Sequence, residues 1–96
     1  MNKLEELKKY SNIDKVNKKA KELNINKVYL STRKDKKYMV LNPNNDKWIH
    51  FGQFGYEDFT KHHDIIKRIK FLKRNWKWAD AELYSPAFLS YYLLWT

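Results

Sequence analysis

Three short runs of β-forming residues between residues 27 and 51 set the main limit on how this chain can fold. The runs are KVYLST, KKYMVLN and KWIHF, and the polar segment RKD and the turn-forming segment NPNND separate them. Runs at this spacing predict a three-stranded antiparallel meander. Two-residue alternation places Tyr38 and Val40 on one face of their strand, and Trp48 and His50 on one face of theirs. Because such a sheet must cover its apolar face, we expect the flanking segments to form helices that pack against it.

An apolar stripe before the first strand predicts one of these helices. Its residues recur at steps of three, four and three, which places them along one side of a helix. The stripe consists of Ile13, Val16, Ala20 and Leu23. Ser11 stands before it as a candidate capping residue, and Asn2 is placed to cap a shorter helix at the N-terminus.

A further helix is predicted from Thr60, its expected N-cap, to about Trp76. Its apolar residues fall within a narrow arc that should face the core, and its basic residues lie roughly opposite. The apolar arc consists of Ile65, Ile69, Leu72 and Trp76. Ser85 and Pro86 then predict the start of a last helix, with the serine as cap, the proline at the first position, and Leu89 and Leu93 facing inward.

The composition fits a single small α+β domain over residues 1–96. Its 16 aromatic residues can fill a core of this size, because each buries roughly 150–250 Å². There is no cysteine, which excludes a disulfide scaffold and a Cys-based zinc site. No run of 18 apolar residues is present, so we expect no membrane span and no membrane contact. No cofactor is expected either.

Positive charge is concentrated in one part of the chain. The net charge is +9, and residues 61–77 hold seven basic residues and one acidic residue. A charge this dense attracts polyanions, although a solvated helix face in a lysine-rich chain would look the same. We expect phosphate contacts from the helix and from a second basic loop, with Phe71 and Trp78 interleaved as base-stacking rings. The expected nucleic-acid-binding residues are Arg33, Lys34, Lys36, Lys37, Lys67, Lys70, Phe71, Lys73, Arg74, Lys77 and Trp78. Alternatively, the two rings pack under the N-terminal helices or the C-terminal tail.

Acidic residues and histidines gather just before the basic segment. Glu57, Asp58, His62 and Asp64 form a weak candidate metal site, but adjacent histidines lack the i, i+4 spacing of a helical ligand pair. Helix capping by Thr60 and Asp64 explains the segment more simply, and a pH-sensitive interface is a third possibility. Gly52 and Gly55 fit a turn that needs positive φ and do not form a phosphate loop. No arrangement of serine, histidine and aspartate supports a catalytic residue.

The combined pattern resembles small uncharacterised proteins of nucleocytoplasmic large DNA viruses. The shared elements are His50-Phe51-Gly52, the stretch from Tyr56 to Asp64, the bases from Lys67 to Arg74, and Ser90 to Trp95. Together with the hairpin that ends in His50-Phe51-Gly52, they cover roughly residues 36–95. We expect the domain to consist of a helical N-terminal segment, 1–26, and a family-like core, 27–96. The resemblance implies a viral source and a role in the virion or in genome handling. The bases here are mostly lysines, which favours non-specific phosphate binding over sequence readout.

Three functions remain open from the sequence. We expect a non-enzymatic accessory protein that binds DNA or RNA, present in the host cytoplasm or viral factory or packaged in the virion. The alternative is a structural or interaction protein, such as a minor virion component or homo-oligomer, that uses the aromatic segment from Phe88 to Trp95. The third is a metal-dependent hydrolase or nuclease at the acidic and histidine cluster.

Overall fold

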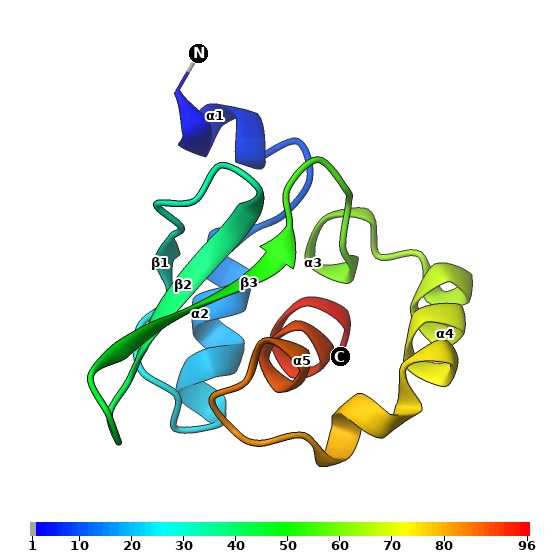
Figure 1. Ribbon diagram of the computed structural model, residues 1–96. Coiled ribbons are helices and arrows are strands. Elements are labelled where there is room, and N and C mark those ends of the chain that lie inside the picture. Colours follow the sequence, from blue (N-terminus) through cyan, green and yellow to red (C-terminus); the bar gives the residue numbers. More distant parts are fainter. Residues whose placement is uncertain (1) are drawn as a thin grey trace.

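The computed structural model describes residues 2–96 and shows an α+β domain in which helices flank a three-stranded sheet (Figure 1). The helices are α1 (Lys3–Leu7), α2 (Ile13–Glu22), α3 (Phe59–His62), α4 (Ile65–Arg74) and α5 (Pro86–Leu89), and the strands are β1 (Tyr29–Leu30), β2 (Lys36–Asn42) and β3 (Lys47–Gln53). A 3₁₀ turn, η1 (Trp76–Asp80), follows α4, and a π-helical segment, η2 (Ser90–Trp95), continues α5. None of the helices within residues 2–96 has the length and apolar character needed to cross a membrane.

The sheet confirms the predicted meander. Its strand order is β1-β2-β3, and both pairings are antiparallel. Tyr38 lies opposite Phe51, and Val40 lies opposite Ile49, on the face that points into the core. The other face carries Trp48, which is 45% exposed and opposite Leu41. The first strand is shorter than its sequence run, because only Tyr29 and Leu30 pair with β2.

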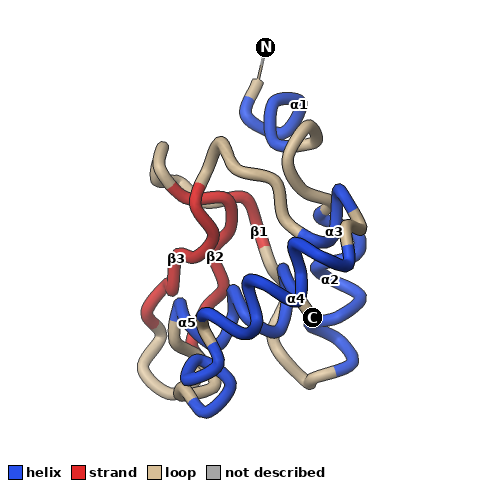
Figure 2. The backbone as a smooth tube through the Cα atoms, turned by 90° about the vertical axis from the view of Figure 1, so that its right-hand side faces the viewer, coloured by secondary structure: helices blue, strands red, loops and turns tan. Residues whose placement is uncertain are grey.

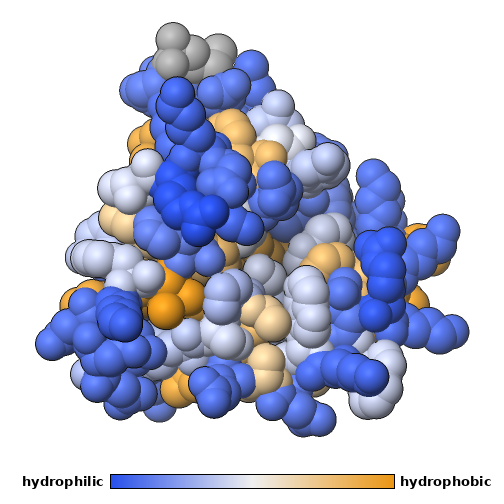
Figure 3. Space-filling model, in the orientation of Figure 1, coloured by the Kyte–Doolittle hydropathy of each residue, from blue (hydrophilic) through white to orange (hydrophobic). Residues whose placement is uncertain are grey.

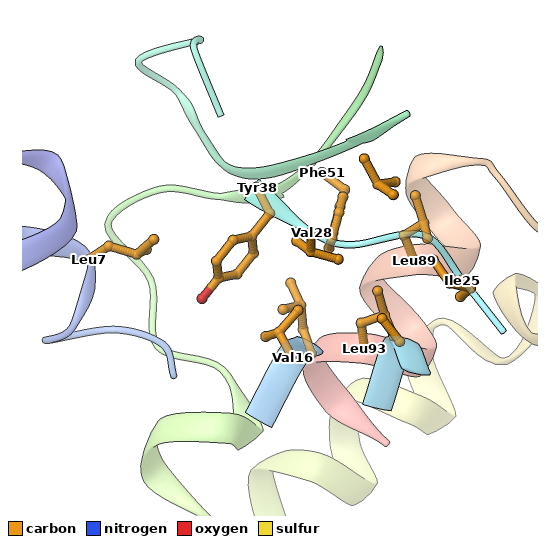
Figure 4. Close-up of a cluster of buried hydrophobic side chains, with 11 residues drawn as sticks. Leu7, Val16, Ile25, Val28, Tyr38, Phe51, Leu89 and Leu93 are labelled. Atoms are coloured by element: carbon orange, nitrogen blue, oxygen red, sulfur yellow. The ribbon is translucent and has the colours of Figure 1, made fainter. Parts of the chain in front are cut away.

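Side chains from the sheet, α2 and the C-terminal helices form one hydrophobic core (Figure 4). Figure 1 shows α2 and the helical tail on the same side of the sheet. The buried residues are Leu7, Val16, Ala20, Ile25, Val28, Tyr38, Val40, Phe51, Leu89, Leu93 and Leu94. Burial of a large apolar side chain contributes roughly 1.5–3 kcal/mol, so this cluster is the main stabilising element of the fold.

The capping residues of the outer helices agree with the sequence. Asn2 accepts a hydrogen bond from the Glu5 amide at 2.9 Å. Ser85 accepts one from the Phe88 amide at 3.2 Å, and Pro86 occupies the first helical position as predicted.

Two of the expected caps differ in the structure. The cap of α2 is Asn12, whose side chain accepts from the Asp14 and Lys15 amides, while its neighbour Ser11 is buried. The expected helix from Thr60 to Trp76 is divided into α3 and α4. His63 between them has φ 53°, a left-handed conformation that ends α3. Asp58 caps α3 and Asp64 caps α4, so Thr60 is not a cap.

Candidate nucleic-acid interface

Helix α4 is attached to the molecule through the C-terminal tail, and it lies on the outer side of that tail, away from the sheet (Figures 1 and 2). The rings of Phe71 and Trp95 stack, with centroids 4.3 Å apart and planes 8° apart. Arg68 donates from Nε to the Trp95 carbonyl at 3.1 Å, and its guanidinium carbon lies 4.9 Å from the Phe59 ring centroid. The side of α4 that carries Arg68 and Phe71 therefore faces inward.

The remaining surface of α4 and the turn η1 that follows it present a row of basic side chains to solvent. We call this set the basic row; its members are Lys67, Lys70, Lys73, Arg74 and Lys77. All five are exposed, and α4 contains no acidic residue. Residues 2–96 form two salt bridges, Arg33–Asp35 and Lys37–Asp58, and neither involves the basic row. These charges are therefore available to an anionic ligand.

The expectation that the apolar arc of α4 faces the core is wrong. Ile65 is 52% exposed, Ile69 is 53% exposed and Trp76 is 62% exposed. The inward side of the helix is instead the neighbouring arc that carries Phe71, because Phe71 stacks there on Trp95. An exposed apolar strip thus runs beside the basic row.

The second basic loop does not join the basic row. Arg33 and Lys34 lie between β1 and β2, well apart from α4 (Figure 1), and Lys36 and Lys37 begin β2. Arg33 is paired with Asp35 at 3.1 Å, Lys34 is exposed and Lys36 is partly buried. Lys37 is buried and paired with Asp58, so it does not contribute to the exposed cationic surface. The structure therefore leaves α4 as the main cationic surface.

Lys37 forms a buried ion pair with Asp58 that links β2 to the start of α3. Its Nζ lies 2.9 Å from Asp58 Oδ2, and the two side chains are 3% and 0% exposed. Burial lowers the pKa of Lys37, and the nearby Asp58 carboxylate opposes this shift. Removing one partner from such a pair leaves an uncompensated charge in the interior, so the pair fixes how the two segments meet.

A chain of buried hydroxyl groups extends from this ion pair. Asp58 Oδ1 accepts hydrogen bonds from the Thr60 amide, at 3.0 Å, and from the Thr60 hydroxyl. The Thr60 and Ser11 hydroxyls lie 3.1 Å apart, and the Tyr38 hydroxyl donates to Ser11 Oγ at 2.6 Å. Burial raises the pKa of Tyr38 well above its usual value of 10. Asp58 and Thr60 of the Asp-Phe-Thr element thus form buried polar contacts inside the fold.

Phe71 stacks on Trp95 of the C-terminal tail, as the alternative interpretation predicted, and Trp78 packs against Phe71. Their ring centroids lie 5.8 Å apart with planes 76° apart. Phe71 is covered on one face by Trp95. They are therefore not a row of rings interleaved with the bases on the helix surface, and both instead line a cavity next to Arg74.

This cavity, which we call the aromatic cavity, has a volume of about 580 Å³. Three segments meet in it: the turn after β3, the α4–η1 segment and the C-terminal tail. The lining residues are Lys37, Gly52, Gln53, Tyr56, Glu57, Phe71, Arg74, Trp78, Ser90, Leu94 and Trp95. Its size falls within the range of roughly 300–1,000 Å³ that is typical of ligand pockets.

Sequence reasoning did not indicate that Gln53 and Tyr56 would share a site with Trp95, because the turn after β3 and the C-terminal tail are far apart in the chain. One signal was present nonetheless. Gly52 has φ 80°, and a Cβ at this position would lie 3.0 Å from Leu94 Cδ1 and 3.2 Å from Lys37 Cδ. The glycine therefore marks a close approach between β3 and the tail at the cavity wall.

The acidic and histidine cluster does not form a metal site. Within residues 2–96 no group of three or more His, Cys, Asp or Glu side chains is placed to hold a metal ion. Asp58 is occupied by Lys37 and Thr60. Asp64 accepts from the Lys67 and Ile66 amides at the start of α4, and these hydrogen bonds hold its pKa below its usual value.

His62 has a packing role at the junction between α3 and α4. Its Nδ1 accepts a hydrogen bond from the Asp64 amide at 2.9 Å, so the neutral ring carries its proton on Nε2. The ring lies 5.3 Å from that of Trp95 and 6.2 Å from that of Phe59. His62 therefore helps the tail hold α4 in place.

The fold and its surface define a small basic α+β protein whose helix α4 carries five basic residues and no acidic residue. Residues 26–75 match a family of unknown function, DUF5754, and this range covers more than half of the chain. The protein therefore belongs to that family. The matched range includes the whole sheet, α3 and α4, but not the tail from Ser90 to Trp95. No curated protein and no solved structure matches the chain.

Proposed function

We propose that this protein binds nucleic acid through phosphate contacts made by the basic row, without catalysing a reaction. The observation that carries the proposal is the group of five exposed basic side chains on α4 and η1, none of them paired with an acid within residues 2–96. The opposite side of α4 is fixed by the stack of Phe71 on Trp95 and by the hydrogen bond of Arg68. The helix that carries the charges therefore has a fixed orientation. Lysine side chains bind phosphate as point charges, which fits binding without sequence readout.

Salt dependence of binding tests this proposal quantitatively. Five phosphate contacts on duplex DNA correspond to a slope of about −4.5 in log K against log salt, and to a loss of roughly 500-fold between 50 and 200 mM salt. Substitution of Lys67, Lys70 and Lys73 by glutamine should lower the steepness of that slope by about 3. The measurement is fluorescence anisotropy with short DNA and RNA over a salt series.

A matched control separates the basic row from net charge. Lys9, Lys21 and Lys47 are exposed lysines in other parts of the chain, and their substitution by glutamine removes the same charge. We expect this triple variant to keep nearly the full slope. Absence of binding at 50 mM salt, or equal losses in the two triple variants, would contradict the proposal.

A second candidate function, docking onto a protein partner, is favoured by the apolar strip on α4. Its members are Ile65, Ile66, Ile69 and Trp76, each more than half exposed. Figure 3 shows apolar surface emerging between hydrophilic side chains over α4. The aromatic tail, which the sequence suggested for this role, is instead covered: Leu93 and Leu94 are buried, and Trp95 is partly buried. Contiguous exposed apolar residues of this kind mark interaction sites.

Self-association is the first form of this second function to test. Light scattering over a concentration series should show a mass above the monomer that falls to the monomer when Ile65 and Ile69 are replaced by glutamine. A wild-type monomer at every concentration would rule out self-association through this strip.

We propose a viral source on the sequence resemblance alone, with a role near the genome in the host cytoplasm, in viral factories or in the virion. Antibody labelling of infected cells and of purified particles tests this. Detection in neither factories nor particles would contradict it.

A further inference from the structure

We propose that the aromatic cavity takes an unpaired nucleobase, so that the preferred ligand is single-stranded or locally unpaired nucleic acid. This inference rests on the proposed function, because the basic row must hold the backbone that carries the base. It goes further by naming the strand state of the ligand and a second binding site for it.

Arg74 joins the two sites. It belongs to the basic row, and it also lines the aromatic cavity together with Phe71 and Trp78 from the same segment. A phosphate held by Arg74 therefore places the attached nucleoside at the mouth of the cavity. A base in a duplex cannot enter, because it is stacked and paired, whereas an unpaired base can turn outward.

The rings of the cavity offer stacking surface for a planar ligand. Phe71 and Trp95 cover each other on one face, and Trp78 meets Phe71 at 76° rather than in a parallel stack. Tyr56 is 69% exposed, and no aromatic ring of the described chain lies against it. Trp78 and Tyr56 are thus the rings best placed to receive a base, and base stacking of this kind accepts any sequence.

Polar groups around the rings suit the edge of a base. Gln53 brings an amide with two donors and an acceptor, Glu57 a carboxylate and Ser90 a hydroxyl. A purely apolar ligand would leave these groups unpaired, and a simple anion would not use the rings. A nucleotide uses the cation, the rings and the hydrogen-bonding groups together.

The test compares a single strand with a duplex of the same length at one salt concentration, by fluorescence anisotropy. We expect wild type to bind the single strand more tightly. Trp78→Leu and Tyr56→Leu should each weaken single-strand binding roughly 5- to 150-fold and leave duplex binding unchanged. Trp48→Leu is the matched control, because Trp48 is an exposed tryptophan on the outer face of the sheet, and it should leave both affinities unchanged.

Two further arms keep the outcome clear. Because Trp78 contacts Phe71, thermal unfolding of the Trp78 variant checks that the variant is still folded. The Tyr56 variant changes a ring that is mostly solvent-exposed. A strand in which every base is removed needs no variant, and it should bind the wild-type protein no better than duplex does.

The two proposals fail in different ways. Salt-dependent binding with equal affinity for single strand and duplex, or with no loss in the Tyr56 and Trp78 variants, overturns the cavity assignment and leaves the basic row intact. Absence of binding to either nucleic acid overturns the proposed function and the cavity assignment with it.

Discussion

Gly52 shows how one residue sets the approach of β3 to the C-terminal tail. Its φ of 80° is costly for a residue with a side chain, and an added Cβ would lie 3.0 Å from Leu94 and 3.2 Å from Lys37. We predict that Gly52→Ala lowers the free energy of unfolding by about 2–3 kcal/mol, from backbone strain together with overpacking. Urea denaturation of wild type and Gly52→Ala measures this difference in the free energy of unfolding.

Gly55 provides the matched control for this substitution. Its φ is 96°, but nothing lies within 4 Å of the position that a Cβ would take. Gly55→Ala should therefore carry only the backbone cost, about 1–2 kcal/mol. Equal losses in the two variants would show that the contact of Gly52 with Leu94 and Lys37 is not a tight one.

Tyr38 should make stability depend on pH in the alkaline range. Burial raises its pKa in the folded protein, so above pH 10 the unfolded chain loses the phenolic proton while the folded chain retains it. The contribution is present below pH 10 and is lost as the pH rises beyond it, by about 1.4 kcal/mol per pH unit. We expect Tyr38→Phe to be less stable than wild type by about 1 kcal/mol at pH 8, from loss of the hydrogen bond to Ser11.

The measurement is urea denaturation of wild type and Tyr38→Phe between pH 8 and 11. Both proteins share Lys37 and the other tyrosines, so their difference isolates Tyr38. The advantage of wild type should shrink above pH 10 and then reverse. A constant difference across this range would mean that the phenol ionises equally in both states.

At the scale of elements, the buried ion pair decides how β2 and α3 are joined. We predict that Asp58→Asn, which conserves the shape of the side chain, lowers the free energy of unfolding by about 3–5 kcal/mol, because the Lys37 ammonium is left buried without a counter-charge. Adding Lys37→Met should recover part of the loss. Thermal and urea unfolding of Asp58→Asn, of Lys37→Met and of the double variant give the coupling free energy between the two side chains.

The exposed pair of Arg33 and Asp35 is the control for the effect of burial. Its side chains are 54% and 53% exposed. Asp35→Asn should leave the unfolding temperature nearly unchanged, because water screens such pairs. If Asp58→Asn proved equally harmless, Lys37 would have to reach solvent or lose its proton in the folded variant.

The sheet and the outer helix caps could be predicted from the sequence because their signals are local. The segment NPNND turns the chain between β2 and β3, and Ser85-Pro86 begins α5, without reference to any distant residue. The basic row could be predicted for the same reason, since its spacing along α4 is enough to place it on one surface.

The orientation of α4 and the aromatic cavity could not be predicted in this way. The apolar arc of Ile65 and Ile69 was the obvious candidate for the inward side, but a helical wheel does not say which side meets a neighbour. Phe71 takes that side because Trp95, 24 residues later, stacks on it. Lys37 was likewise expected on the surface but lies in the interior, because it pairs there with Asp58, which is 21 residues away.

At the scale of the whole molecule, the part that matches the family and the part that forms the hydrophobic core do not coincide. The match covers residues 26–75, yet most of the hydrophobic core lies outside that range. The core residues outside it are Leu7, Val16, Ala20, Ile25, Leu89, Leu93 and Leu94. The sheet inside the matched range therefore depends on α2 and the tail to cover its apolar face.

We predict that a fragment limited to residues 26–75 does not fold. It would keep Val28, Tyr38, Val40 and Phe51 of the core but would expose them to water, and an isolated three-stranded sheet needs a packed apolar face to be stable. Helix α4 would also lose Trp95, its stacking partner. Circular dichroism and amide proton dispersion of the fragment, compared with the full chain in the same buffer, check this. A fragment with cooperative thermal unfolding would contradict it, and would mean that the family-matching segment carries its own core and that the N-terminal helices and the tail are additions to it.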